Sequence, residues 1–379
     1  MSEVTGGVST CAASWAGVSD AGVRRVLGMF VILRIKWCVR ADAVPIIQDS
    51  RRCVKVQKER SDDAANKGRM DTPDTETTPD TEITLTHGDW QLVTSPYGAS
   101  LRGLLRGGAE VVTKYTGAAG KVGGQGDVLI PFPGRVTEGR YTFEGQTLQM
   151  DKNDTEGPNA IHGFVRKKIW DSSSTETEAV YTTEIHESDN PGYPFALNVR
   201  VAYSLSGAGL TVSFKVENTG KTKAPVAAGF HPYFTVGSAL INADTLHMPF
   251  DTYQEYKNLV PTGRVLPVEG TPFDFRQPHP MGDTVLNTCF MQPQRDPDGL
   301  LRVHLSDAGT QKSVTVWMDA AFDYVVLYSG DPLPPDHSRR ALAIEPMTCG
   351  SDAFNHPEWG LVTLAPGETL SGTWGVTAE

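Results

Sequence analysis

Cysteine is scarce in this chain, and its few positions argue against a disulfide framework. The 379 residues include 5 cysteines, and no two of them are spaced as C-x-x-C. They are Cys11, Cys38, Cys53, Cys289 and Cys349. An odd number without close spacing also argues against a cysteine zinc site and fits a reducing compartment, so we expect a cytoplasmic protein. We interpret Cys349 as a buried structural thiol rather than a nucleophile.

The motifs of cofactor and hydrolase chemistry are also absent from the sequence. It contains no G-x-x-x-x-G-K-[ST], no G-x-G-x-x-G at the start of a helix, no H-E-x-x-H and no G-x-S-x-G. We therefore expect neither a nucleotide cofactor nor a serine-hydrolase site. We expect no metal either, because metal ligands usually include one close pair in the sequence and the candidate ligands here lie far apart.

No apolar run has the length and composition that a membrane span needs. The best candidate, residues 26–39, is shorter than the roughly 20 residues that cross a bilayer, and it contains Arg34 and Lys36. A secretory signal is the alternative, because two arginines precede this run and an Ala-Asp-Ala segment that resembles a cleavage site follows it. The charges interrupt the apolar core, so we expect no export and no membrane partner.

The first eighty residues differ in composition from the rest. Residues 1–69 hold 12 Lys and Arg against 7 Asp and Glu, whereas residues 70–379 hold 22 against 38. This larger part therefore carries a net charge of about −16, which disfavours a nucleic-acid partner. We predict a disordered extension over residues 1–80, with Met70 as a candidate translation start, and one catalytic domain over residues 81–379.

From residue 81 onward, short runs alternate between apolar and polar residues, which is the period of half-buried strands. Residues 197–205 and 210–216 alternate in this way, and the Ser-Gly-Ala-Gly segment between them predicts a hairpin. Residues 324–328 predict a strand that is buried on both faces. Since 38 Gly and 25 Pro supply turns and no helical period is sustained, we predict an all-β fold, one large antiparallel β-sandwich.

Three ionisable residues lie inside apolar or aromatic stretches, namely His162, His231 and Glu345. Burying such groups is costly unless they pair, hydrogen-bond or titrate, so we interpret them as acid and base groups. His231 and Glu345 also precede proline, which holds each of them in extended backbone. The alternatives are core histidines satisfied by backbone groups and a glutamate in a structural salt bridge.

Several motifs around these residues resemble those of the aldose 1-epimerases, the galactose mutarotase family, in both order and spacing. They are Gly157-Pro158-Asn159-Ala160-Ile161-His162-Gly163, His231-Pro232-Tyr233-Phe234, Thr271-Pro272-Phe273-Asp274-Phe275-Arg276, Glu345-Pro346-Met347-Thr348, Leu364-Ala365-Pro366-Gly367-Glu368 and Gly372-Thr373-Trp374-Gly375. The resemblance runs from about Trp90 to the end of the sequence. It implies a large β-sandwich of the galactose mutarotase type, with a sugar bound in a cleft on one sheet.

The resemblance also implies a reaction, the interconversion of the α and β anomers of a free aldohexose such as glucose or galactose. The ring opens and closes again, which takes one acid and one base and no cofactor. Glu345 would take the proton from the C1 hydroxyl, His231 would protonate the ring oxygen, and His162 would hold and polarise the substrate. Such groups typically contribute about 10²–10⁴-fold each. We expect a monomer or homodimer whose partner is the sugar.

The implied substrate-binding residues include departures from the family pattern. Arg135 matches a substrate-binding arginine, Tyr233 could stack on a sugar face, and Asn287 stands where many members carry an aspartate. An asparagine still bonds hydroxyl groups but lacks the charge-assisted strength of a carboxylate. Gly134 stands where asparagine is common, and Val326 replaces a glutamine. These departures leave the acid and base groups intact and leave the identity of the sugar open.

Three other functions remain open at the level of sequence. Hexose-6-phosphate 1-epimerases carry a similar His-Gly-Phe segment followed by arginine, and the cluster Arg166-Lys167-Lys168 could hold a phosphate. A noncatalytic carbohydrate-binding protein would keep the sandwich but lose the acid or the base. A glycosidase would need a second carboxylate, and none presents itself as clearly as Glu345.

Overall fold

Strands make up almost all the regular structure in the computed structural model, which describes residues 81–379. The predictions for residues 1–80, including the disordered extension, the Met70 start and the interrupted apolar run, lie outside the described residues. The described part contains β-strands and short 3₁₀ helices, as the missing helical period predicts. None of its helices is long and apolar enough to cross a membrane. The 3₁₀ helices are η1 (Ala118–Gly120), η2 (Thr137–Gly139), η3 (Ile241–Ala243) and η4 (Pro357–Trp359).

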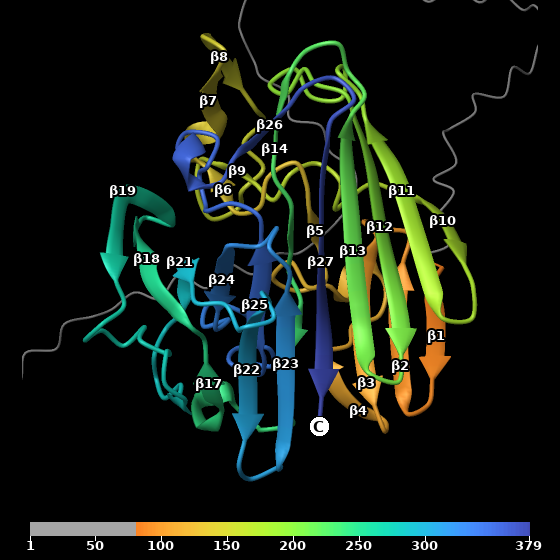
Figure 1. Cartoon of the computed structure of the whole chain (residues 1–379), viewed down its shortest axis with the longest axis vertical. Helices are drawn as coiled ribbons and strands as arrows, with labels where there is room; N and C mark the ends of the chain where they lie inside the picture. Colours follow the sequence, from red (N-terminus) through yellow and green to blue (C-terminus); the bar gives the residue numbers. More distant parts are fainter. Residues whose placement is uncertain (1–80) are drawn as a thin grey trace, which may run out of the picture. The chain divides into compact units, whose positions relative to one another are not determined.

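The larger sheet of residues 81–379 has 12 strands, and its pairings are antiparallel (Figure 1). Ten of them follow one another across the sheet in the order β1 (Ile83–His87), β2 (Trp90–Ser95), β3 (Ser100–Arg106), β4 (Ala109–Val112), β16 (Tyr233–Phe234), β25 (Leu342–Met347), β24 (Tyr324–Tyr328), β21 (Asn287–Pro293), β18 (Phe250–Lys257) and β19 (Val260–Pro267). Off this path, β15 (Gly229–Phe230) pairs with β25 and with β5 (Val128–Leu129).

The second large sheet of this region has nine strands, which are also antiparallel. Their order is β10 (Asp171–Ser174), β11 (Glu178–Ile185), β12 (Leu197–Ser206), β13 (Gly209–Asn218), β27 (Thr369–Ala378), β23 (Lys312–Met318), β22 (Leu301–Asp307), β17 (Thr245–His247) and β20 (His279–Pro280). Three two-stranded sheets pair β14 (Ala224–Val226) with β26 (Val362–Leu364), β6 (Arg135–Val136) with β9 (Ala160–Ile161), and β7 (Arg140–Phe143) with β8 (Gln146–Gln149).

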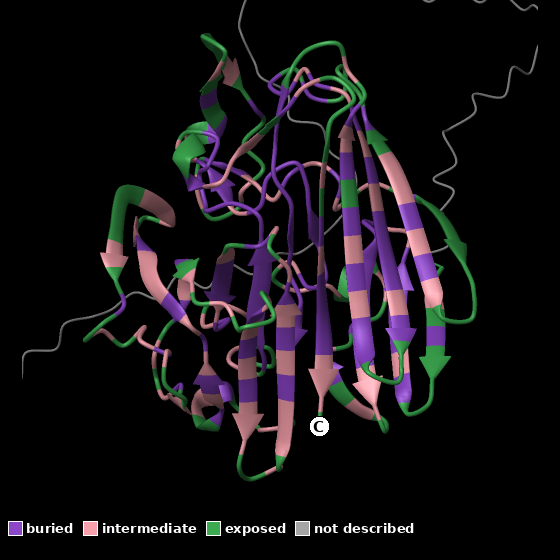
Figure 2. Cartoon of the chain, in the orientation of Figure 1, coloured by how far each residue is buried: buried purple, intermediate pink, exposed green. Residues whose placement is uncertain are grey.

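The two large sheets pack face to face around one hydrophobic core, which confirms the predicted antiparallel sandwich. Figure 1 shows β1–β3 behind β11–β13, and the hydroxyl groups of Thr94 on β2 and Tyr181 on β11 lie 2.6 Å apart. Further along the core, the rings of Phe230 on β15 and Trp374 on β27 have centroids 5.4 Å apart. Figure 2 shows the alternation of buried and half-buried residues along β22 and β23 that such packing requires.

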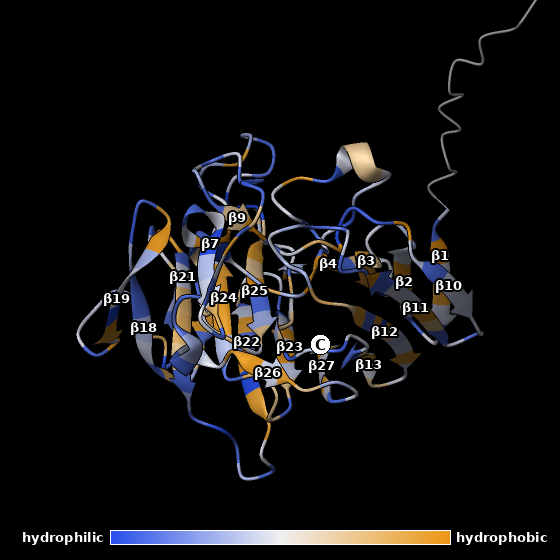
Figure 3. Cartoon of the chain, turned by 90° about the horizontal axis from the view of Figure 1, so that it is seen from above, coloured by the Kyte–Doolittle hydropathy of each residue, from blue (hydrophilic) through white to orange (hydrophobic). Residues whose placement is uncertain are grey.

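Two local predictions are confirmed. β12 and β13 pair antiparallel from Leu197 opposite Asn218 to Ser206 opposite Gly209, so Gly207 and Ala208 make the expected hairpin turn. β24 lies between β21 and β25 with its three central residues buried, and orange hydrophobic residues gather on β24 and β25 in Figure 3. This central position matters because β25 carries Glu345.

The hydrogen bond between Thr94 and Tyr181 gives a test of the sandwich packing. We expect Thr94→Val and Tyr181→Phe each to lower the free energy of unfolding by about 1 kcal/mol, because each leaves a buried hydroxyl group or its partner unsatisfied. Urea unfolding of both single variants and the double variant should give a coupling energy of about 0.5–1.5 kcal/mol. The matched control is the exposed pair Thr142 and Thr147. A coupling no larger than that of the control would contradict this inter-sheet contact.

Candidate active site

The pairing of β15 and β16 with β25 places His231 directly opposite Glu345. Both short strands follow one register, given by the partners Gly229 and Met347 and the partners Tyr233 and Ala343. The same register applies to residues 231 and 232, which lie between β15 and β16. Residues opposite each other in such a pairing project their side chains from the same face of the sheet. The Nε2 atom of His231 accordingly lies 3.3 Å from the Oε1 atom of Glu345.

Two prolines open the hydrogen-bond ladder at this pair. The N–H of Ile344 donates to the carbonyl of Pro232 over 3.3 Å, which fixes the phase of the ladder. With this spacing of the hydrogen bonds, the next two backbone donors toward the partner strand would be the N–H groups of residues 232 and 346. These positions lie directly beside His231 and Glu345. Both residues are proline and have none. In this phase the backbone N–H of His231 points away from β25, and it donates to the carbonyl of Asp127 over 3.0 Å.

His162 joins the pair from a third segment of the chain. β9 pairs with β6, and the N–H of His162 donates to the carbonyl of Gly134 over 2.9 Å. The φ angle of His162 is 62°, in the left-handed region, and its ring meets that of His231 edge to face with centroids 5.5 Å apart. A Cβ atom on Gly163 would lie 2.0 Å from the carbonyl oxygen of Ile130, so only glycine fits after this histidine.

A cavity of about 360 Å³ opens over these three side chains. Five of the six site residues that the sequence predicts line it, namely Arg135, His162, His231, Asn287 and Glu345. The departing positions Gly134 and Val326 line it too. The cavity is also lined by residues that the sequence did not predict, among them Asp154, Glu156, Tyr256, Tyr328 and Ser351. Among the described residues, no three His, Cys, Asp or Glu side chains are grouped as metal ligands.

Tyr233, the sixth predicted site residue, lies behind His231 and does not line this cavity. Its ring stacks on the imidazole of His231, with centroids 5.1 Å apart and an angle of 17° between the planes. Its hydroxyl group donates to the carbonyl of Gly123 over 2.7 Å. The geometry therefore gives Tyr233 contact with the histidine rather than with the cavity.

Arg135 is largely buried and is bound on both sides by acidic residues. Its Nε atom donates to Oδ2 of Asp154 over 2.8 Å, and its Nη2 atom donates to Oε2 of Glu156 over 2.6 Å. These two acids lie 19 and 21 residues away in a polar stretch, where an acidic residue gives no pattern that sequence reasoning could use. The guanidinium group is therefore held in place and has its charge compensated.

The basic cluster of the sequence is divided in space. Arg166 and Lys167 line the cavity, whereas Lys168 does not. The Nζ atom of Lys168 instead donates to Asp189 over 2.5 Å and to the carbonyl of Glu184 over 2.7 Å.

Comparison with known proteins identifies the family. The family described as "Aldose 1-epimerase" matches residues 81–377. The chain belongs to this family. It is 29% identical over 276 residues to uncharacterized protein YihR of Escherichia coli (strain K12), a match that covers 72% of this chain and 85% of the relative. It is 28% identical over 271 residues to galactose mutarotase of Homo sapiens, covering 65% of this chain and 77% of that protein.

Solved structures share the fold of this family member. A GalM/aldose epimerase homologue from C. elegans matches with a TM-score of 0.70 and 19% identity, covering 79% of this chain and 98% of the other. Galactose 1-epimerase from Lactobacillus acidophilus NCFM matches with a TM-score of 0.66 and 20% identity, covering 79% and 94%. The sandwich is therefore of the galactose mutarotase type, as the resemblance implies.

Burial sets the protonation of the three central residues in this aldose 1-epimerase family member. Loss of water raises the pKa of Glu345 well above its ordinary value and lowers that of His162 well below. Burial likewise lowers the pKa of His231 to about 3. Because His231 and Glu345 are in contact, their protonation is coupled. We place one proton on this pair, on Glu345, since burial disfavours both charged forms.

The rings of His162 and His231 should remain neutral at pH values at which a free imidazole becomes charged. In ¹⁵N NMR of the histidine side chains, assigned with His162→Asn and His231→Asn variants, we expect both rings to keep neutral shifts from pH 8 to pH 5. The unfolded chain takes up these protons near the reference pKa of about 6.5, so this uptake lowers the free energy of unfolding as the pH falls below that value. Titration of either ring above pH 6 would contradict this assignment.

Proposed function

We propose that this protein is an aldose 1-epimerase that interconverts the α and β anomers of an aldohexose. The observation that carries the proposal is the contact of 3.3 Å between His231 Nε2 and Glu345 Oε1, both buried and both lining the cavity. An acid and a base in contact that hold one proton between them are what ring opening needs, because one proton leaves the sugar and one is delivered to it. Membership of the family and 28% identity to human galactose mutarotase support the same reaction.

The mechanism assigns one proton transfer to each member of the pair. The reactive form is the ion pair, with Glu345 as carboxylate and His231 as imidazolium. Glu345 takes the proton of the C1 hydroxyl while His231 protonates the ring oxygen, so the C1–O bond of the ring breaks and an aldehyde forms. Rotation about the C1–C2 bond and the reverse transfers give the other anomer. The proton count of the pair is the same before and after.

The remaining residues of the site bind the sugar or hold the acid in this proposal. His162 lies against His231 and, as a neutral ring, can donate one hydrogen bond and accept one. Arg135 presents a guanidinium group that two acids hold in position, and the side-chain amide of Asn287 can bond sugar hydroxyl groups. We give Tyr233 a positioning role, since its ring stacks on His231.

Two of the competing functions are less well supported by the site. A binding protein without catalysis would not need a carboxyl group buried against a histidine, because such burial is costly. A glycosidase would need two free carboxyl groups. The other acids that line the cavity, Asp154 and Glu156, both bind Arg135.

The proposal includes the setting in which the protein works. We propose a cytoplasmic enzyme of carbohydrate metabolism that acts as a monomer or homodimer without cofactor or metal and binds neither nucleic acid nor membrane. The two cysteines of the described region, Cys289 and Cys349, are buried free thiols, which suits a reducing compartment.

Removing the base should abolish catalysis and spare binding. In Glu345→Gln we expect kcat for mutarotation, followed by polarimetry from pure α-glucose or α-galactose, to fall by about 10²–10⁴-fold, because the amide cannot accept the C1 proton. Sugar binding, measured by calorimetry, should change little. The matched control is Glu187→Gln, which removes an exposed carboxylate outside the cavity. Unchanged activity in Glu345→Gln would remove this residue from the mechanism.

The pH dependence should report the shared proton. We expect kcat/KM to follow a bell, because a second proton on the pair at low pH blocks the base and loss of the only proton at high pH removes the acid. His231→Gln should lower kcat and remove one limb of the bell. A wild-type profile that rises or falls with a single step across the stable pH range would contradict the two-group mechanism.

A further inference from the structure

The hydroxyl groups of Tyr256 and Ser351 form a bonded pair in the cavity wall that leaves one hydrogen unused. Tyr256 donates to the Oγ atom of Ser351 over 2.5 Å. A hydroxyl group donates one hydrogen bond, and the hydroxyl hydrogen of Ser351 has no acceptor among residues 81–379. Both residues line the cavity, and Ser351 is 4% exposed, comparable with Glu345 at 3% and His231 at 5%. A ligand in the cavity can therefore accept the hydrogen of Ser351.

The surrounding protein holds this hydroxyl pair in place. The side-chain amide of the buried Gln254 accepts from the N–H of Ser351 over 3.0 Å and donates to its carbonyl over 3.2 Å. Burial raises the pKa of Tyr256 well above its ordinary value, and the nearby Cys289 raises it further. The phenol group therefore stays protonated and remains the donor to Ser351.

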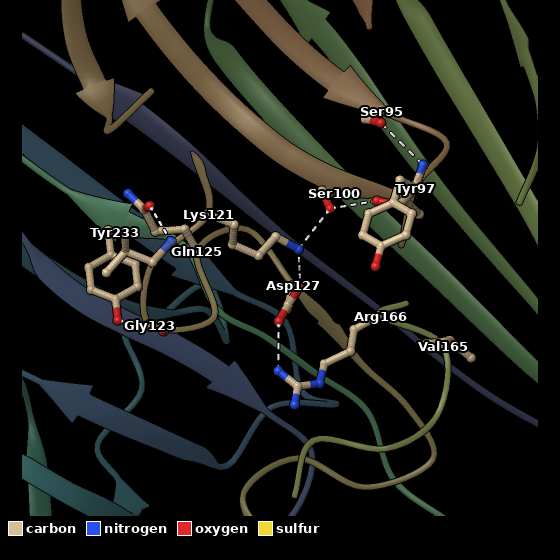
Figure 4. Close-up of polar contacts among 12 residues, drawn as sticks. Ser95, Tyr97, Ser100, Lys121, Gly123, Gln125, Asp127, Val165, Arg166 and Tyr233 are labelled. Atoms are coloured by element: carbon tan, nitrogen blue, oxygen red, sulfur yellow. Dashed lines mark hydrogen bonds and ion pairs between the residues drawn. The ribbon is translucent and has the colours of Figure 1, made fainter. Parts of the chain in front are cut away.

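Other hydrogen-bonding groups around the cavity are already bonded within the protein. The hydroxyl group of Tyr233 donates to the carbonyl of Gly123, and Nη1 of Arg166 donates to Asp127, which also binds Lys121 (Figure 4). Ser351 differs from Tyr233, because its hydroxyl group accepts a hydrogen bond and keeps its own hydrogen for a ligand.

The hydroxyl pair lies on the side of Glu345 that faces away from His231. In the larger sheet β25 is followed by β24, β21 and β18, and Tyr256 lies on β18, whereas His231 lies between β15 and β16 on the other side of β25. In the proposed mechanism His231 faces the ring oxygen and Glu345 faces the C1 hydroxyl. Since C1 is bonded to both the ring oxygen and C2, C2 points away from His231, toward β24, β21 and β18.

The floor of the cavity on this side of Glu345 is apolar. Val326 lines the cavity and clusters with Cys289 and Met347. These side chains offer no strong donor to an oxygen atom on C2. The hydrogen bond to such an oxygen atom would come from the wall, where Ser351 has its hydrogen free.

We propose that Ser351, oriented by Tyr256, binds the substituent on C2 of the sugar, so that the preferred substrate is an aldose with an oxygen acceptor there: the C2 hydroxyl group of a hexose or the carbonyl group of a 2-acetamido sugar. This inference rests on the proposed function, because the roles of Glu345 and His231 set the direction of the sugar. Ser351 is then a binding residue, and Tyr256 is a positioning residue that acts through it. A 2-deoxy sugar leaves the hydrogen of Ser351 without an acceptor, which lowers affinity.

Ser351→Ala and Tyr256→Phe test the C2 subsite with glucose, N-acetylglucosamine and 2-deoxyglucose. Exchange between anomers is measured by NMR, and kcat/KM for each sugar is divided by the value for 2-deoxyglucose. Comparing this ratio between proteins cancels the intrinsic reactivity of each sugar. We expect Ser351→Ala to lower the ratio for glucose or N-acetylglucosamine about tenfold, mainly through KM, because one hydrogen bond is lost. Tyr256→Phe should lower it by a smaller factor, since the hydroxyl group of Ser351 remains but is no longer oriented. The matched control is Tyr324→Phe, which removes a hydroxyl group on β24 outside the cavity and should leave the ratio unchanged.

Equilibrium binding separates failure of the C2 subsite from failure of the proposed function. Calorimetry with the same three sugars measures affinity even where no turnover occurs. Tighter binding of glucose or N-acetylglucosamine than of 2-deoxyglucose, lost in Ser351→Ala, supports the subsite whether or not the protein is an epimerase. No such preference in the wild type, or a preference that survives in Ser351→Ala, overturns the subsite. Turnover of any of the sugars in that case leaves the proposed function standing. Which of the two sugars binds more tightly distinguishes a C2 hydroxyl group from an acetamido carbonyl group.

Discussion

The site depends on the register that pairs β15 and β16 with β25. This register alone puts His231 opposite Glu345, and a shift by one residue would turn one of the two side chains into the sandwich core. The prolines at 232 and 346 remove the N–H donors that would flank the pair. The remaining backbone hydrogen bonds fix the register, and the hydrogen bonds beside His231 and Glu345 are missing. Glu345 lies on β25 and His231 lies between the short strands β15 and β16, so the larger sheet gives the proposed base and the proposed acid a rigid support.

The same register determines which residues surround Glu345 and exclude water from it. In the row of opposite residues, Glu345 faces Val326 on β24, and Val326 faces Cys289 on β21. These apolar neighbours supply no hydrogen bond, so the charge of Arg135 and the contact with His231 are what the carboxylate has to stabilise it. This explains why burial dominates its pKa. Val326, which stands where the family resemblance implies a glutamine, therefore sets the environment of Glu345 as well as lining the cavity.

Sequence reasoning succeeded where residues repeat or conflict with their surroundings. Alternation predicted β12 and β13, and charge within apolar stretches predicted His162, His231 and Glu345, which the structure brings together. It did not find Asp154 and Glu156, because acidic residues in a polar loop are ordinary. They bind Arg135, whose position depends on the pairing of β6 with β9, two segments that are not adjacent in the sequence. Sequence reasoning also predicted that Tyr233 contacts the substrate, because an aromatic motif does not reveal on which face of a strand the ring lies.

The neighbours of Gly134 explain why glycine, and not asparagine, stands at this position. Its φ angle is 65°, and a Cβ atom there would lie 2.7 Å from the Oγ atom of Ser351. That oxygen accepts a hydrogen bond from Tyr256 over 2.5 Å, while Gln254 bonds both the N–H and the carbonyl of Ser351. Asparagine at position 134 would have to displace a serine held from three directions. Gly134 and Ser351 thus form one unit of the cavity wall, so a side chain at position 134 would also require a change at Ser351.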